Sequence, residues 1–147
     1  MKTFNQFIAE AFDKPYKYDL EKEDDETYYG YFRAGDNSLI QVMFYFYDPD
    51  WSIEFSRNGS QSVTGEGDAM RIFATVIKVI EEFLKQEKPK KAVFSALKPS
   101  DKEDRKEKLS REKLYARLVK RFASKMGYNA RENSFSGGTE WHLTRKK

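Results

Sequence analysis

The sequence predicts one α/β (α+β) domain, with a mostly antiparallel mixed sheet and two main helices, and three observations support this prediction. Residues 16–57 hold strand-like segments separated by short turns. Residues 64–96 hold a glycine-containing turn, a long amphipathic helix and a short apolar strand. Residues 114–144 hold a second amphipathic helix and two further strand-like segments. Because strands precede and follow the long helix, its apolar face can pack on a sheet.

The length and composition fit a single folded domain. Aromatic residues make up 16% of the 147 residues, which argues against disorder. We expect residues 13–147 to form this domain, and residues 1–12 to form a short N-terminal helix or a cleavable targeting peptide. Because the chain has no cysteine, disulfides, thiolate metal sites and cysteine nucleophiles are excluded.

The sequence also limits where the protein resides and what it binds. No apolar run approaches the ~20 residues of a transmembrane helix, so we expect no membrane partner. Polar residues interrupt the first twelve positions, so we do not expect secretion by a signal peptide. The net charge of +3 does not by itself predict nucleic-acid binding, although Lys and Arg dominate from position 111 onward.

Four strands are expected in the first half of the chain, at residues 16–22, 27–33, 39–47 and 51–57. Their short connecting turns predict an antiparallel meander. In the third strand both alternating faces are apolar or aromatic, which is typical of a central strand covered on both sides. In the fourth, apolar and polar residues alternate, so one face should be buried.

The long helix is expected to begin after Gly67, with Asp68 placed to cap it or to meet the positive end of its dipole. It should end near Glu87, since Pro89 follows closely. The next strand, residues 91–97, follows a crossover helix and should lie parallel to a neighbour. A second helix should end at Gly127 as its C-cap, before a closing hairpin.

The order of elements from residue 51 to 144 resembles the GNAT N-acetyltransferase superfamily, with the whole chain reading β-β-β-β-α-β-α-β-β. In that family a turn of the form Gln/Arg-x-x-Gly-x-Gly/Ala binds the pyrophosphate of acetyl-CoA at a helix start. Gly65 and Gly67 match its two glycines, whereas Ser62 stands at its first position. The resemblance implies an acetyl-CoA site formed by Thr64, Gly65, Glu66, Gly67 and Asp68.

An acetyl-CoA site is one of two explanations for this turn. Against it, the carboxylates of Glu66 and Asp68 would repel a diphosphate. The two glycines can also be explained as an ordinary connection between a strand and a helix.

A second family signature is a helix that ends in Leu-Tyr-x-x-x-Gly-Phe, whose tyrosine protonates the departing CoA thiolate. Gly127 and Tyr128 fit the end of this signature, but Ala123 occupies the place of the tyrosine. If the protein is an enzyme, Tyr115 or Tyr128 would then be the nearest acids, and Glu54 the base that takes the proton of the amine.

The first ten residues, MKTFNQFIAE, resemble the capsid-targeting peptides of T4-like tailed bacteriophages. Those peptides carry internal head proteins into the prohead and are removed after an aliphatic residue, any residue and glutamate. The resemblance implies cleavage between Glu10 and Ala11. The alternative is a terminal amphipathic helix docked on the domain.

The second helix carries a run of basic residues that are candidates for binding nucleic acid or a partner protein. They are Lys113, Arg117, Lys120, Arg121 and Lys125. A solvated helix face is the alternative. The single histidine, His142, cannot make a multi-histidine metal site, and we expect no metal.

Two functions from different classes are consistent with these features. The first is a bacteriophage protein packaged in the head, with an acetyltransferase-like but catalytically incomplete fold, that binds packaged DNA or, in the host cytoplasm, a host protein. The second is an active N-acetyltransferase that uses acetyl-CoA. The missing tyrosine at Ala123 favours the first.

Overall fold

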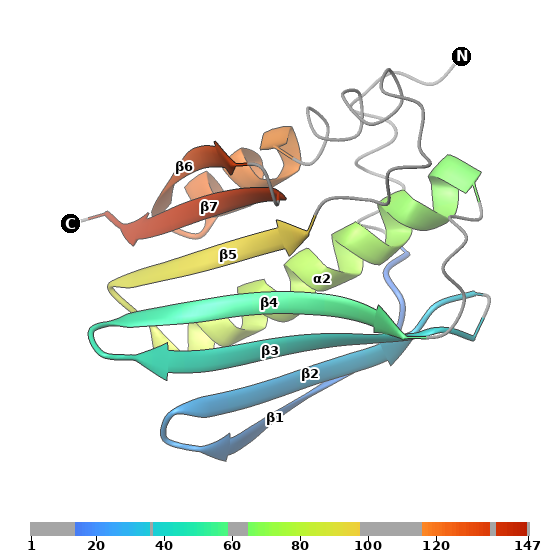
Figure 1. The fold of residues 1–147 in the computed structure, drawn as a ribbon, viewed down its shortest axis with the longest axis horizontal. Coiled ribbons are helices and arrows are strands. Elements are labelled where there is room, and N and C mark those ends of the chain that lie inside the picture. The colour runs from blue at the N-terminus through green and yellow to red at the C-terminus, as the bar shows by residue number, and fades with distance from the viewer. Residues whose placement is uncertain (1–13, 36, 59–64, 98–115, 136–137, 147) are drawn as a thin grey trace.

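The computed structural model describes residues 14–35, 37–58, 65–97, 116–135 and 138–146 (Figure 1). The labelled elements are β1 (Tyr18–Asp24), β2 (Thr27–Arg33), β3 (Leu39–Tyr47), β4 (Asp50–Asn58), α2 (Gly65–Glu87), β5 (Lys91–Leu97), β6 (Tyr128–Phe135) and β7 (Gly138–Arg145). The described part of a second helix, residues 116–125, precedes β6.

The strands form one mixed sheet in the order β1-β2-β3-β4-β5-β7-β6. Its pairs are antiparallel except for β4 and β5, which are parallel. Both the predicted fold class and the predicted order β-β-β-β-α-β-α-β-β are confirmed. The parallel pair follows from topology, because α2 carries the chain back across the sheet between these two strands.

Both helices pack on the same face of the sheet, which holds the hydrophobic core. Phe83 of α2 lies at its centre, with its ring centroid 4.3 Å from that of Phe44 and 5.0 Å from those of Tyr28 and Trp51. The buried residues of the second helix, Val119 and Phe122 among them, belong to the same cluster. Figure 1 shows α2 behind the sheet, running obliquely to the strands.

The opposite face of the sheet differs from the expectation for β3. Ile40, Val42 and Phe44 are fully buried, as predicted for the face that meets α2. Met43 and Tyr45 on the other face are only half-buried, and no helix in the described ranges covers them. The prediction of a strand covered on both sides was therefore wrong for this part of the chain, because both helices take the same side.

The helix boundaries follow local sequence signals. α2 ends at Glu87 as predicted, and Lys88 then adopts a positive φ of 51° before Pro89. Gly127 has a φ of 83° after the second helix, which confirms its predicted role as a C-cap. Tyr16, expected in β1, lies before it and stacks on Phe32 with centroids 5.9 Å apart.

Candidate functional site

The parallel pair β4 and β5 separates along its length. Four residue pairs join the two strands, from Trp51 opposite Ala92 to Glu54 opposite Ser95. Beyond this point β4 still pairs with β3 and β5 still pairs with β7. We call the opening between residues 55–58 of β4 and 96–97 of β5 the fork. Figure 1 shows the two strands spreading apart toward the end of the sheet where α2 begins.

The fork offers backbone groups that a ligand can use. It lies at the carboxyl ends of the parallel pair β4 and β5, the edge at which open α/β sheets bind ligands, although the strand order does not reverse at this point. Each strand edge that faces the fork has backbone groups that the sheet does not pair. These edges can therefore accept an extended ligand that carries amide groups.

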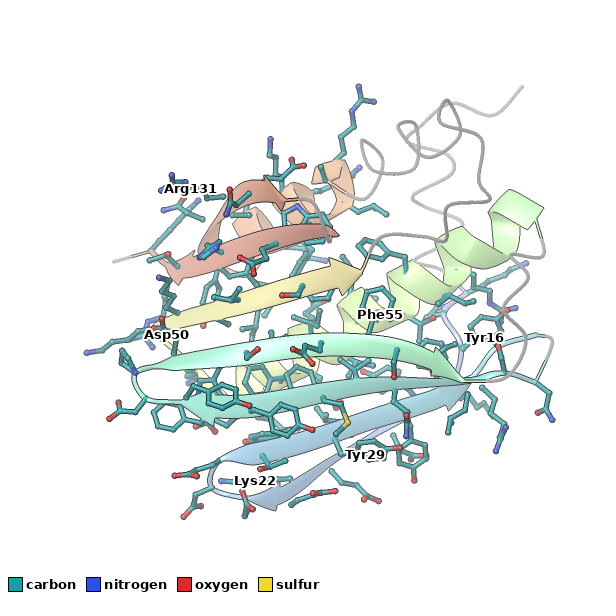
Figure 2. The ribbon with its side chains drawn as sticks, viewed as in Figure 1. Tyr16, Lys22, Tyr29, Asp50, Phe55 and Arg131 are labelled. Carbon is teal, nitrogen blue, oxygen red and sulfur yellow. The ribbon has the colours of Figure 1, made fainter. Side chains whose placement is uncertain are left out.

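Aromatic side chains line the helix side of the fork. The ring of Phe55 stacks on that of Phe94 with centroids 5.8 Å apart, and it meets Phe73 of α2 edge-on at 6.3 Å. Phe73 and Phe94 are buried, but Phe55 is only half-buried, as expected for a residue at an opening (Figure 2). Trp141 stacks on Phe94 at 5.2 Å, and its buried indole Nε1 has no hydrogen-bond partner in the described structure.

Glu54 lies at the vertex of the fork, on the face of the sheet opposite α2. Its side chain is exposed, and Ser95 is its partner across the last pair of β4 and β5. On the same face Glu140 pairs with Ser95 and lies 3.3 Å from the Nε2 of His142. The predicted base thus stands beside other groups that can exchange protons.

Tyr45 was not among the predicted site residues, yet it lies close to Glu54. Tyr45 pairs with Ser52, two residues before Glu54 on the same face of β4. The pKa of the Tyr45 hydroxyl is raised above its ordinary value, mainly by burial and to a smaller extent by the negative charge of Glu54. Tyr45 lies between Phe44 and Phe46 in the sequence, and this alternation indicates that its side chain is on the face away from the core. The sequence does not indicate that Tyr45 lies near Glu54, because that depends on the register of β3 and β4.

The predicted glycine turn belongs to the helix itself. Gly65 begins α2, so Gly65, Glu66, Gly67 and Asp68 form its first turn, and the expectation that the helix begins after Gly67 was wrong. The first four N–H groups of a helix have no partner within it. Such backbone groups can donate hydrogen bonds to an anion. Thr64 lies outside the described residues.

Tyr128, one of the two predicted acids, lies far from the predicted base Glu54. Tyr128 is buried and its hydroxyl donates a hydrogen bond of 2.7 Å to the carbonyl of Pro89. Along the strand direction, Tyr128 lies level with the residue before β5, whereas Glu54 and Ser95 are the last residues that pair β4 with β5. Tyr128 and Glu54 are therefore separated by at least four residues, or roughly 13 Å, along the strands. The structure does not bring Tyr128 and Glu54 together. Tyr115 lies outside the described residues, and Ala123 is buried in the core.

The basic residues of the second helix lie on its exposed side. Arg117, Lys120, Arg121 and Lys125 are all exposed, and the apolar residues between them face the core. Lys113 and the predicted cleavage site at Glu10 and Ala11 lie outside the described residues. Arg131, labelled in Figure 2, adds an exposed cation on β6.

The described residues contain neither a metal-binding cluster nor a helix that could span a membrane. No group of three or more His, Asp or Glu side chains is arranged to hold a metal ion in these ranges. Neither described helix has the length and apolar character needed to cross a membrane.

Comparisons with known proteins show a similarity at the level of structure. No protein-family model matches the chain, and no curated protein matches it. Among solved structures, the chain is similar to a proposed acetyltransferase from Sphaerobacter thermophilus DSM 20745, with a TM-score of 0.46 and 11% sequence identity. The match covers 100% of this chain and 90% of the other.

Proposed function

We propose that the protein binds acetyl-CoA in the fork and transfers the acetyl group to an amine. The observation that carries this proposal is the separation of β4 from β5 after Glu54 and Ser95, at the end of the sheet where α2 begins. Unpaired strand edges next to a helix start suit a ligand that has both an extended amide chain and phosphates.

Two features of acetyl-CoA favour binding in the fork, and one feature of the protein disfavours it. Its pantetheine arm carries two amides and can pair with the strand edges as an added strand. Its pyrophosphate can accept hydrogen bonds from the first-turn amides of α2, at the positive end of the helix dipole. The carboxylates of Glu66 and Asp68 repel phosphate, so we expect a weaker affinity than a neutral first turn would give.

The residues around the fork can perform the proton transfers of an acetyl transfer. Acetyl-CoA supplies an activated acetyl thioester. Glu54 takes the proton that the attacking amine loses. The Tyr45 hydroxyl is protonated at neutral pH, as a tyrosine ordinarily is, and burial and the charge of Glu54 raise its pKa further. It can therefore give a proton to the departing sulfur, the role of the family tyrosine whose place Ala123 takes.

Thermal unfolding of the full chain with and without millimolar acetyl-CoA tests binding. A ligand at ~100 times its dissociation constant adds about 2.7 kcal/mol to the free energy of unfolding. Because the chain has no cysteine, a thiol reagent then detects released CoA without background when a lysine peptide is added as acceptor. Absence of a thermal shift would contradict the proposal.

A Gly67→Ala variant sharpens the binding test. Alanine favours the helix over glycine by up to about 1 kcal/mol, so the unliganded protein should melt at the same or a higher temperature. The added methyl group should hinder approach of the pyrophosphate, so the shift caused by acetyl-CoA should shrink. Gln86→Ala, near the other end of α2, is the matched control and should leave the shift unchanged.

A second candidate function rests on the exposed cations of the second helix. In this proposal the protein is carried in a phage head and binds packaged DNA or a host protein through these cations. For DNA, replacing Lys120 and Lys125 with alanine should weaken binding to any sequence and should reduce the slope of log K against log salt by about 2. An unchanged slope would contradict this role.

Packaging has its own test. If residues 1–10 direct the chain into the head, mass spectrometry of purified particles should find a protein that begins at Ala11. Full-length chains in mature particles, or no chains at all, would contradict the targeting role.

A further inference from the structure

We propose that the face of the sheet opposite α2 docks a lysine- and arginine-rich segment of a partner protein. The docking surface lies on β1 to β4 and is formed by Asp19, Glu21, Tyr29, Tyr31, Tyr45 and Glu54, which we call the tyrosine face. This inference does not require acetyl-CoA binding, because most of the face lies on strands that do not border the fork.

The strand register arranges the tyrosine face as carboxylates on either side of aromatic rings. Asp19 is paired with Tyr31, and Glu21 with Tyr29. Continuing across the sheet, Tyr29 is paired with Met43, and Met43 with Glu54. One row across four strands therefore reads Glu21, Tyr29, Met43, Glu54, with a negative charge at each end and no cation between them.

The side chains of the tyrosine face are accessible. The three carboxylates are exposed and the three tyrosines are half-buried, and Tyr47 at the end of β3 has 68% of its surface exposed. The rings of Tyr29 and Tyr31 lie 5.2 Å apart and tilt by 31°, and Gln41 donates a hydrogen bond of 2.7 Å to the Tyr29 hydroxyl. Tyr29 is labelled in Figure 2, on the sheet in front of α2.

A shallow hollow marks one end of this surface. It has a volume of about 410 Å³ and is lined by Asp19, Tyr29 and Tyr31 together with Lys17 and Arg33. Arg33 donates a hydrogen bond of 3.0 Å to the carbonyl of Asn37 within its own hairpin. The hollow thus holds two cations beside one carboxylate, whereas the rest of the tyrosine face, from Glu21 to Tyr45 and Glu54, continues away from them toward β4.

The electrostatics of the tyrosine face favour cations. The negative charge of Asp19, and to a smaller extent that of Glu21, raises the pKa of the Tyr31 hydroxyl. A negative potential at this surface has this effect because it disfavours the ionised form of tyrosine. A Lys or Arg side chain above a tyrosine ring gains about 0.5–1 kcal/mol at an exposed site, and a nearby carboxylate adds to this. Tyrosine is also common where protein interfaces bind most strongly.

The size of the surface points to a polypeptide rather than to a single small amine. From β1 to β4 the surface spans three strand spacings, or roughly 14 Å. One ammonium group covers one ring and one carboxylate, whereas an extended segment of about five residues reaches across all four strands. A segment with several cations can therefore engage both ends of the row at once.

A peptide titration with the full chain tests the proposal. The probe is a synthetic twelve-residue peptide of alternating lysine and serine, titrated by calorimetry at low and at physiological ionic strength. The test variant is Asp19→Asn/Glu21→Gln. The matched control is Asp25→Asn/Glu132→Gln, which changes the net charge equally at exposed positions outside the tyrosine face.

We expect the test variant to bind the peptide at least about threefold more weakly than wild type, and the control to bind it within twofold. Tyr31→Thr, which removes the ring and places a β-branched residue that suits a strand, should also weaken binding by about two- to fivefold. Circular dichroism and thermal unfolding verify that each variant is folded. Affinity should fall as salt rises.

Four results would overturn the proposal. The first is no binding by wild type at low ionic strength, and the second is an equal loss of affinity in the test and control variants. The third is equally tight binding of spermine, which would assign the surface to small polyamines. The fourth is self-association of the chain that the test variant abolishes, since the occupant would then be a second copy. None of these results bears on the thermal shift by acetyl-CoA.

Discussion

Glu54 and Ser95 are the last residues that pair β4 with β5, and this single relationship defines the candidate site. Each strand keeps its outer partner beyond this point, so the divergence separates two intact halves of one sheet. The exposed carboxylate of Glu54 therefore stands at the vertex of an opening, with unpaired backbone on both sides. A base at this position can reach a ligand held in the fork.

Glu54→Gln should lower the rate of acetyl transfer by about 10²–10⁴-fold, because general-base catalysis typically contributes that much. The substitution keeps the size and exposure of the side chain, so the thermal shift caused by acetyl-CoA should stay as in wild type. Release of CoA thiol in the presence of a lysine peptide measures the rate. An unchanged rate would remove Glu54 from the mechanism and leave acetyl-CoA binding as a separate question.

Tyr45→Phe tests the second proton transfer. Loss of the hydroxyl should slow CoA release by up to about 10²-fold at neutral pH, with little effect on acetyl-CoA binding. The effect should diminish at high pH, because a thiol with an ordinary pKa near 8.5 leaves as a thiolate without needing an acid. Tyr47→Phe, on the same face and more exposed, is the matched control. Equal rates for Tyr45→Phe and wild type would contradict the role.

Much of the fold could be predicted from the sequence because its signals are local. The bounds predicted for β2, β3 and β5 agree with the structure, since turn residues and proline bracket each of these strands. The parallel placement of β5 was also predicted, because a crossover helix returns the chain to the same sheet. The C-cap at Gly127 was predicted from the glycine alone and has the expected positive φ.

The site could be predicted only in part, because it depends on which strands lie side by side and where they stop pairing. The alternating pattern of 51–57 placed Glu54 on the polar face of its strand. Nothing in the sequence indicated that its pairing with β5 ends there, or that Tyr45 of β3 lies diagonally across from it. No helix among the described residues covers the second face of β3, which was predicted to be buried, and aromatic residues such as Tyr45 suit a half-buried surface as well as a core.

Gly30→Ala should destabilise the protein, because Gly30 lets α2 approach β2. A Cβ at this position would lie 2.6 Å from the Cγ1 atom of Val79. Valine is rigid about χ1 and Val79 is fully buried, so we expect a loss of about 1–3 kcal/mol in the free energy of unfolding. Urea denaturation of wild type and variant measures the loss.

A double-mutant cycle separates this clash from a general effect of alanine in a strand. Val79→Ala alone leaves a cavity and should also destabilise. In the double variant the added methyl group occupies part of that cavity, so its loss should be smaller than the sum of the two single losses by about 1 kcal/mol or more. Strict additivity would contradict the proposed contact.

The Tyr28 hydroxyl should make stability depend on pH in the alkaline range. Tyr28 is 2% exposed and donates a hydrogen bond of 2.9 Å to Glu87, and burial followed by this bond raises its pKa to about 12. The unfolded chain loses this proton near pH 10, whereas the folded chain keeps it until about pH 12. Stability from this group is therefore complete below pH 10 and is lost as pH rises toward 12.

The measurement compares the free energy of unfolding of wild type with that of Tyr28→Phe at several pH values. Other titrating groups are common to both proteins, so their difference isolates Tyr28. The advantage of wild type should fall by roughly 2 kcal/mol between pH 9 and 12. A difference that stays constant over this range would mean that the hydroxyl ionises alike in both states.

Tyr128→Phe distinguishes a structural tyrosine from a catalytic one. The Tyr128 hydroxyl donates a hydrogen bond of 2.7 Å to the carbonyl of Pro89. A tyrosine is ordinarily protonated at neutral pH, and burial raises the pKa of Tyr128 further. Removing the hydroxyl leaves that carbonyl without this donor and should cost about 1 kcal/mol of stability. CoA release below the melting temperature should equal that of wild type, because Tyr128 lies at the far end of β5 from Glu54. A slower release together with an unchanged melting temperature would instead assign Tyr128 to the reaction and would require the two ends of the sheet to communicate.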